Sequence, residues 1–115
     1  MADEKDNQIK IYLGRRRLQH LQGGKLIQEY PIAVGKPSTP TPTGEYRVIN
    51  KLMNPGGPFG TRWMGLSAPG VGIHGTNTPK LIGFAVSHGC IRMHNKDVEQ
   101  LYPQIPIGTK VTILP

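Results

Sequence analysis

The chain has 115 residues, 15 of them glycine and 11 proline, and it carries a formal net charge of +7. This length suits one domain, and no apolar run approaches the roughly 18 residues that a membrane-spanning helix needs. The positive charge indicates polyanionic surroundings, such as an anionic cell-wall polymer. No helix-turn-helix, zinc-finger or aromatic-rich RNA-binding pattern accompanies the charge, so a nucleic-acid partner is not expected.

The first third of the chain predicts three strands. Residues 1–8 contain no apolar signal core and are expected to form a flexible lead-in, which leaves 9–115 as the single domain. Runs of β-forming residues predict strands over 9–13, 16–22 and 25–35. Gly23 and Gly24 supply the turn of a hairpin between the second and third strands.

Further strands and one helix are predicted in the rest of the chain. The strands are expected over 45–51, 61–67, 70–75 and 109–114, with Pro- and Gly-rich loops at 36–44 and 54–60. A helix is expected at about 95–104, where Asn95 can cap the first turn and Pro103 limits the length. Together these elements predict a mainly β fold, a mixed barrel or sandwich with one short helix.

The only cysteine, Cys90, lies in the run "SHGCIR". A lone cysteine is often a small buried hydrophobe, but its neighbours favour a nucleophile. Gly89 lets the backbone approach a substrate closely, and consecutive N–H groups in such a loop can hold the oxyanion of an acyl transfer. The sequence therefore favours Cys90 as the nucleophile of such a reaction.

Three histidines lie near Cys90 in the sequence, and a nucleophilic cysteine needs a base or a cationic neighbour. His88 would be about 6.5 Å away in an extended chain, too far for a direct hydrogen bond unless the turn is tight. His94 is expected to shape the loop before the helix. His74 ends a predicted strand and is the favoured base, and its imidazolium would lower the pKa of the thiol.

Acidic residues are absent between Glu45 and Asp97, a span with several Arg and Lys residues. A carboxylate to orient His74 would have to come from elsewhere in the chain, so the carbonyl of Gly75 is the simpler partner. The same absence argues against a glycosidase, which needs paired carboxylates. The basic residues of the span, Arg92 among them, favour a substrate that carries carboxylates.

Zinc is the other common use of cysteine and histidine together. Four ligands are available on paper, namely His74, His88, Cys90 and His94. The spacing H-x-C-x₃-H matches no common structural zinc pattern, and no second cysteine supports it. We therefore expect no metal.

The runs "GIHGTN" and "IGFAVSHGCIRMHNKDV" closely resemble the signature of the L,D-transpeptidase catalytic domain, the YkuD-type family. The earlier run "VGKPSTPTPTGEYRV" resembles the strand and loop that precede the site in that family. The resemblance covers roughly residues 9–114 and implies a mixed β fold and an enzyme of bacterial peptidoglycan. In that family a cysteine attacks the carbonyl at the third residue of a stem tetrapeptide. Terminal D-alanine leaves, and an amine acceptor resolves the thioester into a 3→3 cross-link.

The same resemblance implies a role for each matching residue. Cys90 is the nucleophile, His74 is the base and Gly75 offers its carbonyl to the His74 ring. N–H groups near His88, Gly89 and Cys90 form the oxyanion hole, and no step needs a metal or cofactor. The residues implied to line the site and bind the stem peptide are Ser87, Arg92, Thr76 and Asn77. Carbapenem-type β-lactams are implied as covalent inhibitors, because a strained lactam carbonyl mimics the acyl donor.

Three alternatives stay open at this point. Water could resolve the thioester, which would make the protein an L,D-carboxypeptidase with the same residues. The domain could be a non-catalytic, cationic wall-binding module, although a pure binder does not need Cys90. A cytoplasmic thiol sensor would need a resolving thiol from another molecule. By resemblance we expect a place in the cell envelope. This sequence shows no signal peptide, so a mature or excised domain and an intracellular form stay open as alternatives.

Overall fold

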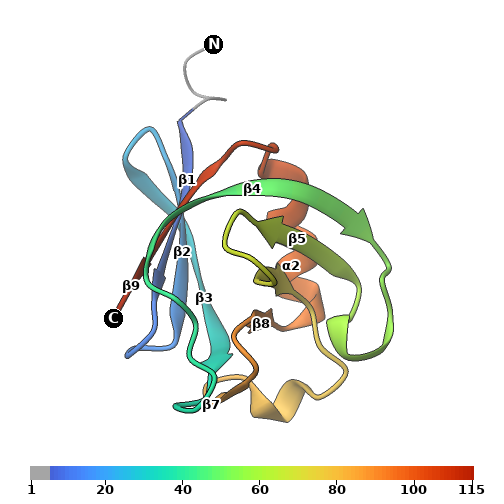
Figure 1. Cartoon of the computed structure of the whole chain (residues 1–115). Helices are drawn as coiled ribbons and strands as arrows, with labels where there is room; N and C mark the ends of the chain where they lie inside the picture. The colour runs from blue at the N-terminus through green and yellow to red at the C-terminus, as the bar shows by residue number, and fades with distance from the viewer. Residues whose placement is uncertain (1–5) are drawn as a thin grey trace.

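A computed structural model describes residues 6–115 as a curved β structure with an α-helix beside it (Figure 1). The strands are β1 (Asn7–Tyr12), β2 (Arg17–Gln22), β3 (Lys25–Gly35), β4 (Gly44–Met53), β5 (Arg62–Leu66), β6 (Gly72–His74), β7 (Ala85–Ser87), β8 (Ile91–Met93) and β9 (Lys110–Leu114). The helical segments are α2 (Asn95–Leu101) and the short 3₁₀ helices η1 (Gly57–Phe59), η2 (Pro79–Leu81) and η3 (Tyr102–Gln104).

The strands form one sheet in the order β2-β1-β9-β4-β5-β6-β8-β3-β7. Because β2 also pairs with β3, the first eight strands of this order close into a barrel, and β7 lies at its edge. Two long strands make this closure possible. Strand β4 pairs first with β9 and then with β5, while β3 passes from β2 to β8 and β7. The predicted mainly β fold with one short helix is confirmed.

Alternation along the strands separates a buried face from a solvent face. Ile9 and Ile11 on β1 are fully buried, whereas Lys10 between them is only half-buried. Helix α2 covers part of the core with Val98 and Leu101, both of which are fully buried. These two residues are three positions apart, the spacing of neighbours on one face of a helix.

The predicted helix at 95–104 is divided into two parts. Helix α2 ends at Leu101 and continues as η3, with Pro103 inside the 3₁₀ segment, where its missing N–H interrupts the α-helical pattern. His94 is the N-cap residue, and its side chain makes no capping hydrogen bond. The predicted cap by Asn95 is therefore wrong. The Asn95 side chain instead binds main-chain groups of two neighbouring segments.

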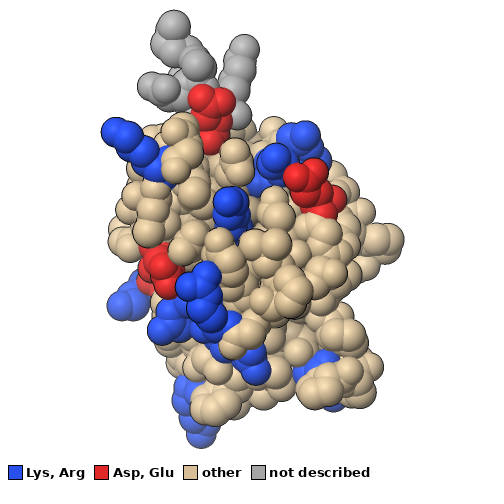
Figure 2. Space-filling model, turned by 90° about the vertical axis from the view of Figure 1, so that its left-hand side faces the viewer, with Lys and Arg blue, Asp and Glu red and all other residues tan. Residues whose placement is uncertain are grey.

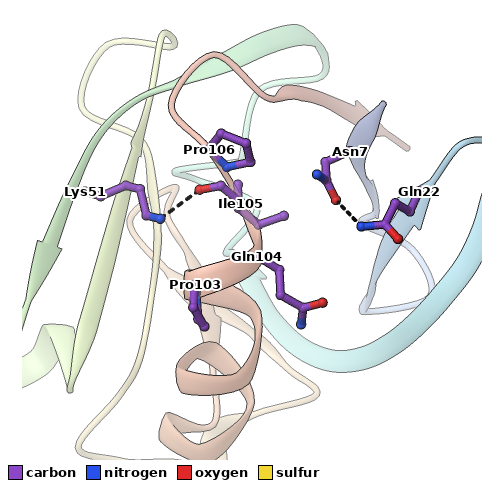
Figure 3. Close-up of a pocket in the computed structure, with 7 residues that line it drawn as sticks. All are labelled: Asn7, Gln22, Lys51, Pro103, Gln104, Ile105 and Pro106. Atoms are coloured by element: carbon purple, nitrogen blue, oxygen red, sulfur yellow. Dashed lines mark hydrogen bonds between the residues drawn. The ribbon is translucent and has the colours of Figure 1, made fainter. Parts of the chain in front are cut away.

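Lys51 of β4 holds the end of the helical segment. Its ammonium donates to the carbonyls of Tyr102 at 2.7 Å and Ile105 at 2.8 Å. These contacts border a cavity of about 410 Å³, with Asn7 and Gln22 on one side and residues 103–106 on the other (Figure 3). No cysteine or histidine lines this cavity. Lys51 therefore joins β4 to the end of the helical segment.

Two features of the chain differ from the sequence-based expectation. Strands β7 and β8, which flank Cys90, were not predicted, because each has only three residues and lies in a Gly-containing run. Strand β1 begins at Asn7, inside the expected lead-in, where Asn7 pairs with Gln22 of β2. Residues 1–5 of that lead-in lie outside the described residues.

The outward face of β1, β2 and β9 carries several basic side chains (Figure 2). Strand register places Lys10, Arg17 and Lys110 on the same side of these strands. Glu29 and Glu45 each lie 3.4 Å from one of these cations, Arg17 and Lys110 respectively. We call this basic surface, defined by Lys10, Arg17 and Lys110, the basic sheet face.

Candidate active site

Strands β6 and β8 place His74, Arg92 and Cys90 on one face of the sheet. The two strands are parallel, with Ile73 opposite Ile91 and His74 opposite Arg92. Ile73 and Ile91 are fully buried in the core. Because side chains alternate along a strand, His74 and Arg92 point to the opposite face, and Cys90, directly before β8, joins them.

These three side chains line a cavity of about 340 Å³. The cavity is also lined by Pro58, Phe59, Trp63, Gly70, Ser87 and His88. They come from three parts of the chain that are distant in sequence: η1, then β5 with the loop after it, and the end of β7 with the segment that follows it. The barrel thus gathers the only thiol of the chain, two histidines and an arginine at one opening.

The His74 ring is 3% exposed and is oriented by the end of its own strand. Nδ1 lies 2.5 Å from the carbonyl oxygen of Gly75. Because a carbonyl oxygen can only accept, Nδ1 carries the proton and Nε2 has the lone pair that a general base needs. Burial lowers the pKa of His74; the Gly75 hydrogen bond acts in the opposite direction, and the Arg92 charge lowers it further. The imidazole is therefore neutral at pH 7.

Two aromatic rings contact the His74 ring. Trp63 lies opposite His74 in the β5–β6 pairing and stacks on it, with ring centres 5.7 Å apart and planes inclined by 15°. Phe59 meets the imidazole edge-on at 5.1 Å. The indole of Trp63 is held in turn by a hydrogen bond of 3.0 Å from Nε1 to Asn50 Oδ1. These contacts shield one side of the imidazole from water and fix its plane.

Cys90 is half-buried, and burial raises the pKa of its thiol. A backbone hydrogen bond from Gly72 and the charge of Arg92 lower this pKa, but burial is the larger effect. The thiol Sγ lies 3.6 Å from the carbonyl oxygen of Gly70, which accepts its proton. The sequence-based expectation of a lowered thiol pKa is therefore wrong, because burial of the thiol outweighs the Gly72 hydrogen bond and the Arg92 charge.

Ser87 holds the loop that leads to Cys90. Its hydroxyl donates to the carbonyl of Cys90 at 2.6 Å and accepts from the N–H of Gly89 at 3.1 Å. Gly89 has a φ of +123°, a backbone conformation that residues with a side chain rarely adopt. Of the N–H groups expected to form an oxyanion hole, that of Gly89 is therefore bound within the loop.

One known protein family matches nearly the whole chain, including all residues that line the cavity. Residues 6–113 match the YkuD family model, described as the L,D-transpeptidase catalytic domain. The chain belongs to the YkuD L,D-transpeptidase family. It is 54% identical over 105 residues to the Bacillus subtilis protein YkuD, which is assigned by name to the L,D-transpeptidases. That alignment covers 91% of this chain and 64% of the relative, so the chain spans less than two thirds of its length.

Solved L,D-transpeptidase structures have the same fold. An L,D-transpeptidase from Mycobacterium smegmatis superposes with a TM-score of 0.86 at 19% identity, over 96% of this chain and 59% of that one. The Ldtfm–avibactam carbamoyl enzyme superposes with a TM-score of 0.84 at 30% identity, over 96% and 49% of the two chains. The YkuD-type fold that the sequence motifs imply is thereby confirmed.

Two residues that the family resemblance implied in substrate binding do not line the cavity. Thr76 is 2% exposed, and its hydroxyl accepts the N–H of Thr78 at 2.9 Å, so it stabilises a turn. Asn77 is exposed and lies outside the set of lining residues. His94 occupies the N-cap position of helix α2 and is also outside that set. In contrast, Ser87, His88 and Arg92 do line the cavity with Cys90 and His74.

Sequence reasoning missed Phe59 and Trp63 as site residues of this YkuD-family domain. A signal existed, since Trp63 is the only tryptophan and Phe59 one of two phenylalanines. A strand or loop pattern does not reveal which distant ring an aromatic side chain will contact, however. The strand pairing that sets Trp63 opposite His74 is needed to find the contact.

The four residues weighed from the sequence as a zinc site lie within residues 6–115, which the structure describes. In this range no group of three or more His, Cys, Asp or Glu side chains is arranged to hold a metal ion. A search of the same residues finds no helix that is long and apolar enough to cross a membrane.

Proposed function

We propose that this protein is a cysteine-dependent L,D-transpeptidase acting on peptidoglycan stem tetrapeptides. Membership of the YkuD family supports the reaction class. The observation that carries the proposal is the His74 ring, whose Nδ1 is bound to Gly75 so that Nε2 can take a proton. This imidazole lines the same cavity as Cys90, the only thiol of the chain.

In the proposed mechanism, Cys90 Sγ attacks the carbonyl carbon of the third stem residue while the thiol proton moves to His74 Nε2. The bond from that carbon to the nitrogen of terminal D-alanine then breaks, and His74 gives the proton to the leaving amine. A thioester on Cys90 results. An amine from a second stem attacks it and forms the 3→3 peptide bond, while its proton passes through His74 to the departing sulfur.

The protonation states support a general-base mechanism. Burial keeps both the Cys90 thiol and the His74 imidazole neutral, so the thiolate forms during attack and is not held as a resting ion pair. The N–H groups of His88 and Cys90 are the proposed oxyanion donors, because that of Gly89 is bound to Ser87. Arg92 in the cavity wall is proposed to bind a carboxylate of the donor stem.

The proposal extends to inhibitors, place of action and a polymer partner. The 30% identical Ldtfm–avibactam carbamoyl enzyme supports covalent capture of strained acyl groups at such a site, and we propose that carbapenems acylate Cys90. The proposed place of action is the cell envelope, where the stem peptides are. The basic sheet face is proposed to contact anionic wall polymer by charge complementarity.

Incubation with a purified disaccharide-tetrapeptide, followed by mass spectrometry, tests the proposal. A transpeptidase releases D-alanine and forms a cross-linked dimer. An L,D-carboxypeptidase releases D-alanine and leaves only the disaccharide-tripeptide, because water is the acceptor. Cys90→Ala should give neither product. If the folded parent protein binds the substrate and converts none of it, the proposal is wrong and a wall-binding module is favoured.

A further inference from the structure

The side chain of Asn95 binds two segments that carry rings of the active site. Its Oδ1 accepts the N–H of Thr61 at 3.2 Å and the N–H of Thr76 at 3.1 Å. Asn95 is the first residue of helix α2, a position from which a side chain can reach back to loops around the helix start. One amide oxygen therefore joins the helix to two loops that are otherwise distant in sequence.

Two glycines allow this close approach. A Cβ atom at Gly60 would lie 2.3 Å from Asn95 Oδ1, and a Cβ atom at Gly75 would lie 2.1 Å from the same oxygen. Real Cβ contacts are essentially never shorter than 3.0 Å. Both backbones can therefore reach the amide only because they lack side chains. Because two separate backbone segments approach the same oxygen this closely, the contact is a specific feature of the packing and not an incidental polar contact.

The bound segments are those that determine the position of the His74 ring. Thr61 lies between Phe59 and Trp63, and both of these rings contact His74. Thr76 directly follows Gly75, whose carbonyl accepts the His74 Nδ1 proton. The Asn95 oxygen therefore fixes the Gly75 peptide from one side and the aromatic segment from the other.

We infer that Asn95 is a positioning residue for catalysis: its amide oxygen holds the Gly75 carbonyl and the Phe59–Trp63 segment so that His74 keeps its Nδ1–H tautomer. This inference rests on the proposed function of His74 as the general base. Without the amide oxygen, the N–H groups of Thr61 and Thr76 lose their partner, and the Gly75 peptide is free to rotate. The imidazole then also populates the tautomer with the proton on Nε2, which cannot accept the thiol proton.

Four variants separate positioning from general stability. Asn95→Ala removes the oxygen, and Asn95→Asp keeps an acceptor of the same shape. Thr109→Val is the matched control, since it removes a buried hydroxyl bond of 2.6 Å to Pro106 in the loop before β9. His74→Gln supplies a background without the imidazole. If Asn95→Ala does not fold, Asn95→Ser, whose shorter hydroxyl cannot span both N–H groups, takes its place.

The first readout is the NMR spectrum of the His74 ring nitrogens. The His74 signals are assigned as those that disappear in His74→Gln. We expect the signals of the Nδ1–H tautomer in the parent, in Asn95→Asp and in Thr109→Val, and a mixture of both tautomers in Asn95→Ala. The second readout is the rate of Cys90 acylation by a carbapenem, measured by intact mass. A displacement of about 1 Å at such a site costs about 100-fold, so we expect Asn95→Ala to be 10- to 100-fold slower and Asn95→Asp to recover most of the rate.

Coupling to His74 decides the outcome. In the His74→Gln background, adding Asn95→Ala should change the acylation rate by less than about twofold, because residues that act through one group are not additive. The inference would be overturned by an unchanged His74 spectrum in Asn95→Ala. It would also be overturned if Asn95→Ala slowed acylation as much in the His74→Gln background as in the parent protein. The spectrum does not depend on turnover, so it tests Asn95 even if the parent fails to convert a tetrapeptide, a result that would contradict only the proposed function.

Discussion

A methyl group at position 72 would collide with the ring that stacks on His74. An ideal Cβ on Gly72 lies 2.4 Å from Cη2 of Trp63, and two further indole atoms are 2.6 and 2.8 Å away. Ordinary van der Waals contact begins at 3.4 Å, so the indole must retreat by about 1 Å. The backbone of Gly72 does not itself require glycine, because its φ is not positive. Gly72→Ala should therefore destabilise the fold by steric overlap with the Trp63 indole and not by backbone strain.

The structure gives a magnitude for both stability and activity. Overpacking of this kind costs about 1–3 kcal/mol, which corresponds to a decrease in Tm of about 4–12 °C for a domain of this size. Because Trp63 stacks on His74 with ring centres 5.7 Å apart, a shift of about 1 Å also disturbs the base. We expect acylation of Cys90 to slow by about 100-fold. Thermal melts and intact-mass kinetics with a carbapenem measure the two effects.

Two further variants test whether the collision is the cause. Gly14 also has no positive φ, and a Cβ there would meet nothing closer than 3.8 Å, so Gly14→Ala should leave Tm and acylation nearly unchanged. Adding Trp63→Phe to Gly72→Ala removes the colliding part of the indole and should restore most of the lost stability. The reasoning is refuted if Gly72→Ala behaves like Gly14→Ala, or if the smaller ring at position 63 brings no recovery.

Four other outcomes follow from the charges and protonation states. The midpoint of Cys90 alkylation by iodoacetamide should lie above the ordinary range, because burial raises the pKa of the thiol, and Arg92→Gln should raise it further by removing a nearby positive charge; a midpoint below about 8.5 contradicts this. Burial lowers the pKa values of His20 and His74 in the folded state, so the unfolded chain binds more protons below about pH 6.5. The free energy of unfolding should therefore decrease as the pH is lowered, by at most about 1.4 kcal/mol per pH unit for each histidine. Thermal melts of His74→Gln should show a smaller decrease per pH unit; equal slopes for variant and parent would count against a buried neutral His74. A carbapenem should add one molecule to the parent protein and none to Cys90→Ala, as intact-mass spectra would show; a parent mass that stays unchanged argues against an acylable Cys90. Sedimentation with wall carrying anionic polymer should weaken as salt rises and weaken more in Lys10→Glu than in Lys96→Glu, which changes the net charge by the same amount; equal loss in both variants would exclude the basic sheet face as the contact.

The sequence motifs pointed to Cys90 and His74 as candidate site residues because the information that singles them out is local. The only thiol lies in "SHGC", and His74 directly precedes the glycine whose carbonyl it binds. Strands β3 and β4 were also predictable, since their β-forming runs are long. Strands β7 and β8 were not, because three residues are too few to show an alternating pattern. Thr76 and Asn77 were assigned to substrate by their place in the motif, whereas neither residue lines the cavity and the Thr76 hydroxyl binds the N–H of Thr78.

The sequence by itself determined the mainly β class and the family, and its motifs put forward Cys90 and His74 as the proposed nucleophile and base. Only the tertiary structure decided what surrounds them. Trp63 reaches His74 through strand pairing, and Asn95 reaches Thr61 across 34 positions of the chain. The direction of the thiol pKa shift was likewise set by burial. Burial depends on how distant segments pack around a side chain, and no spacing of residues in a motif contains that quantity.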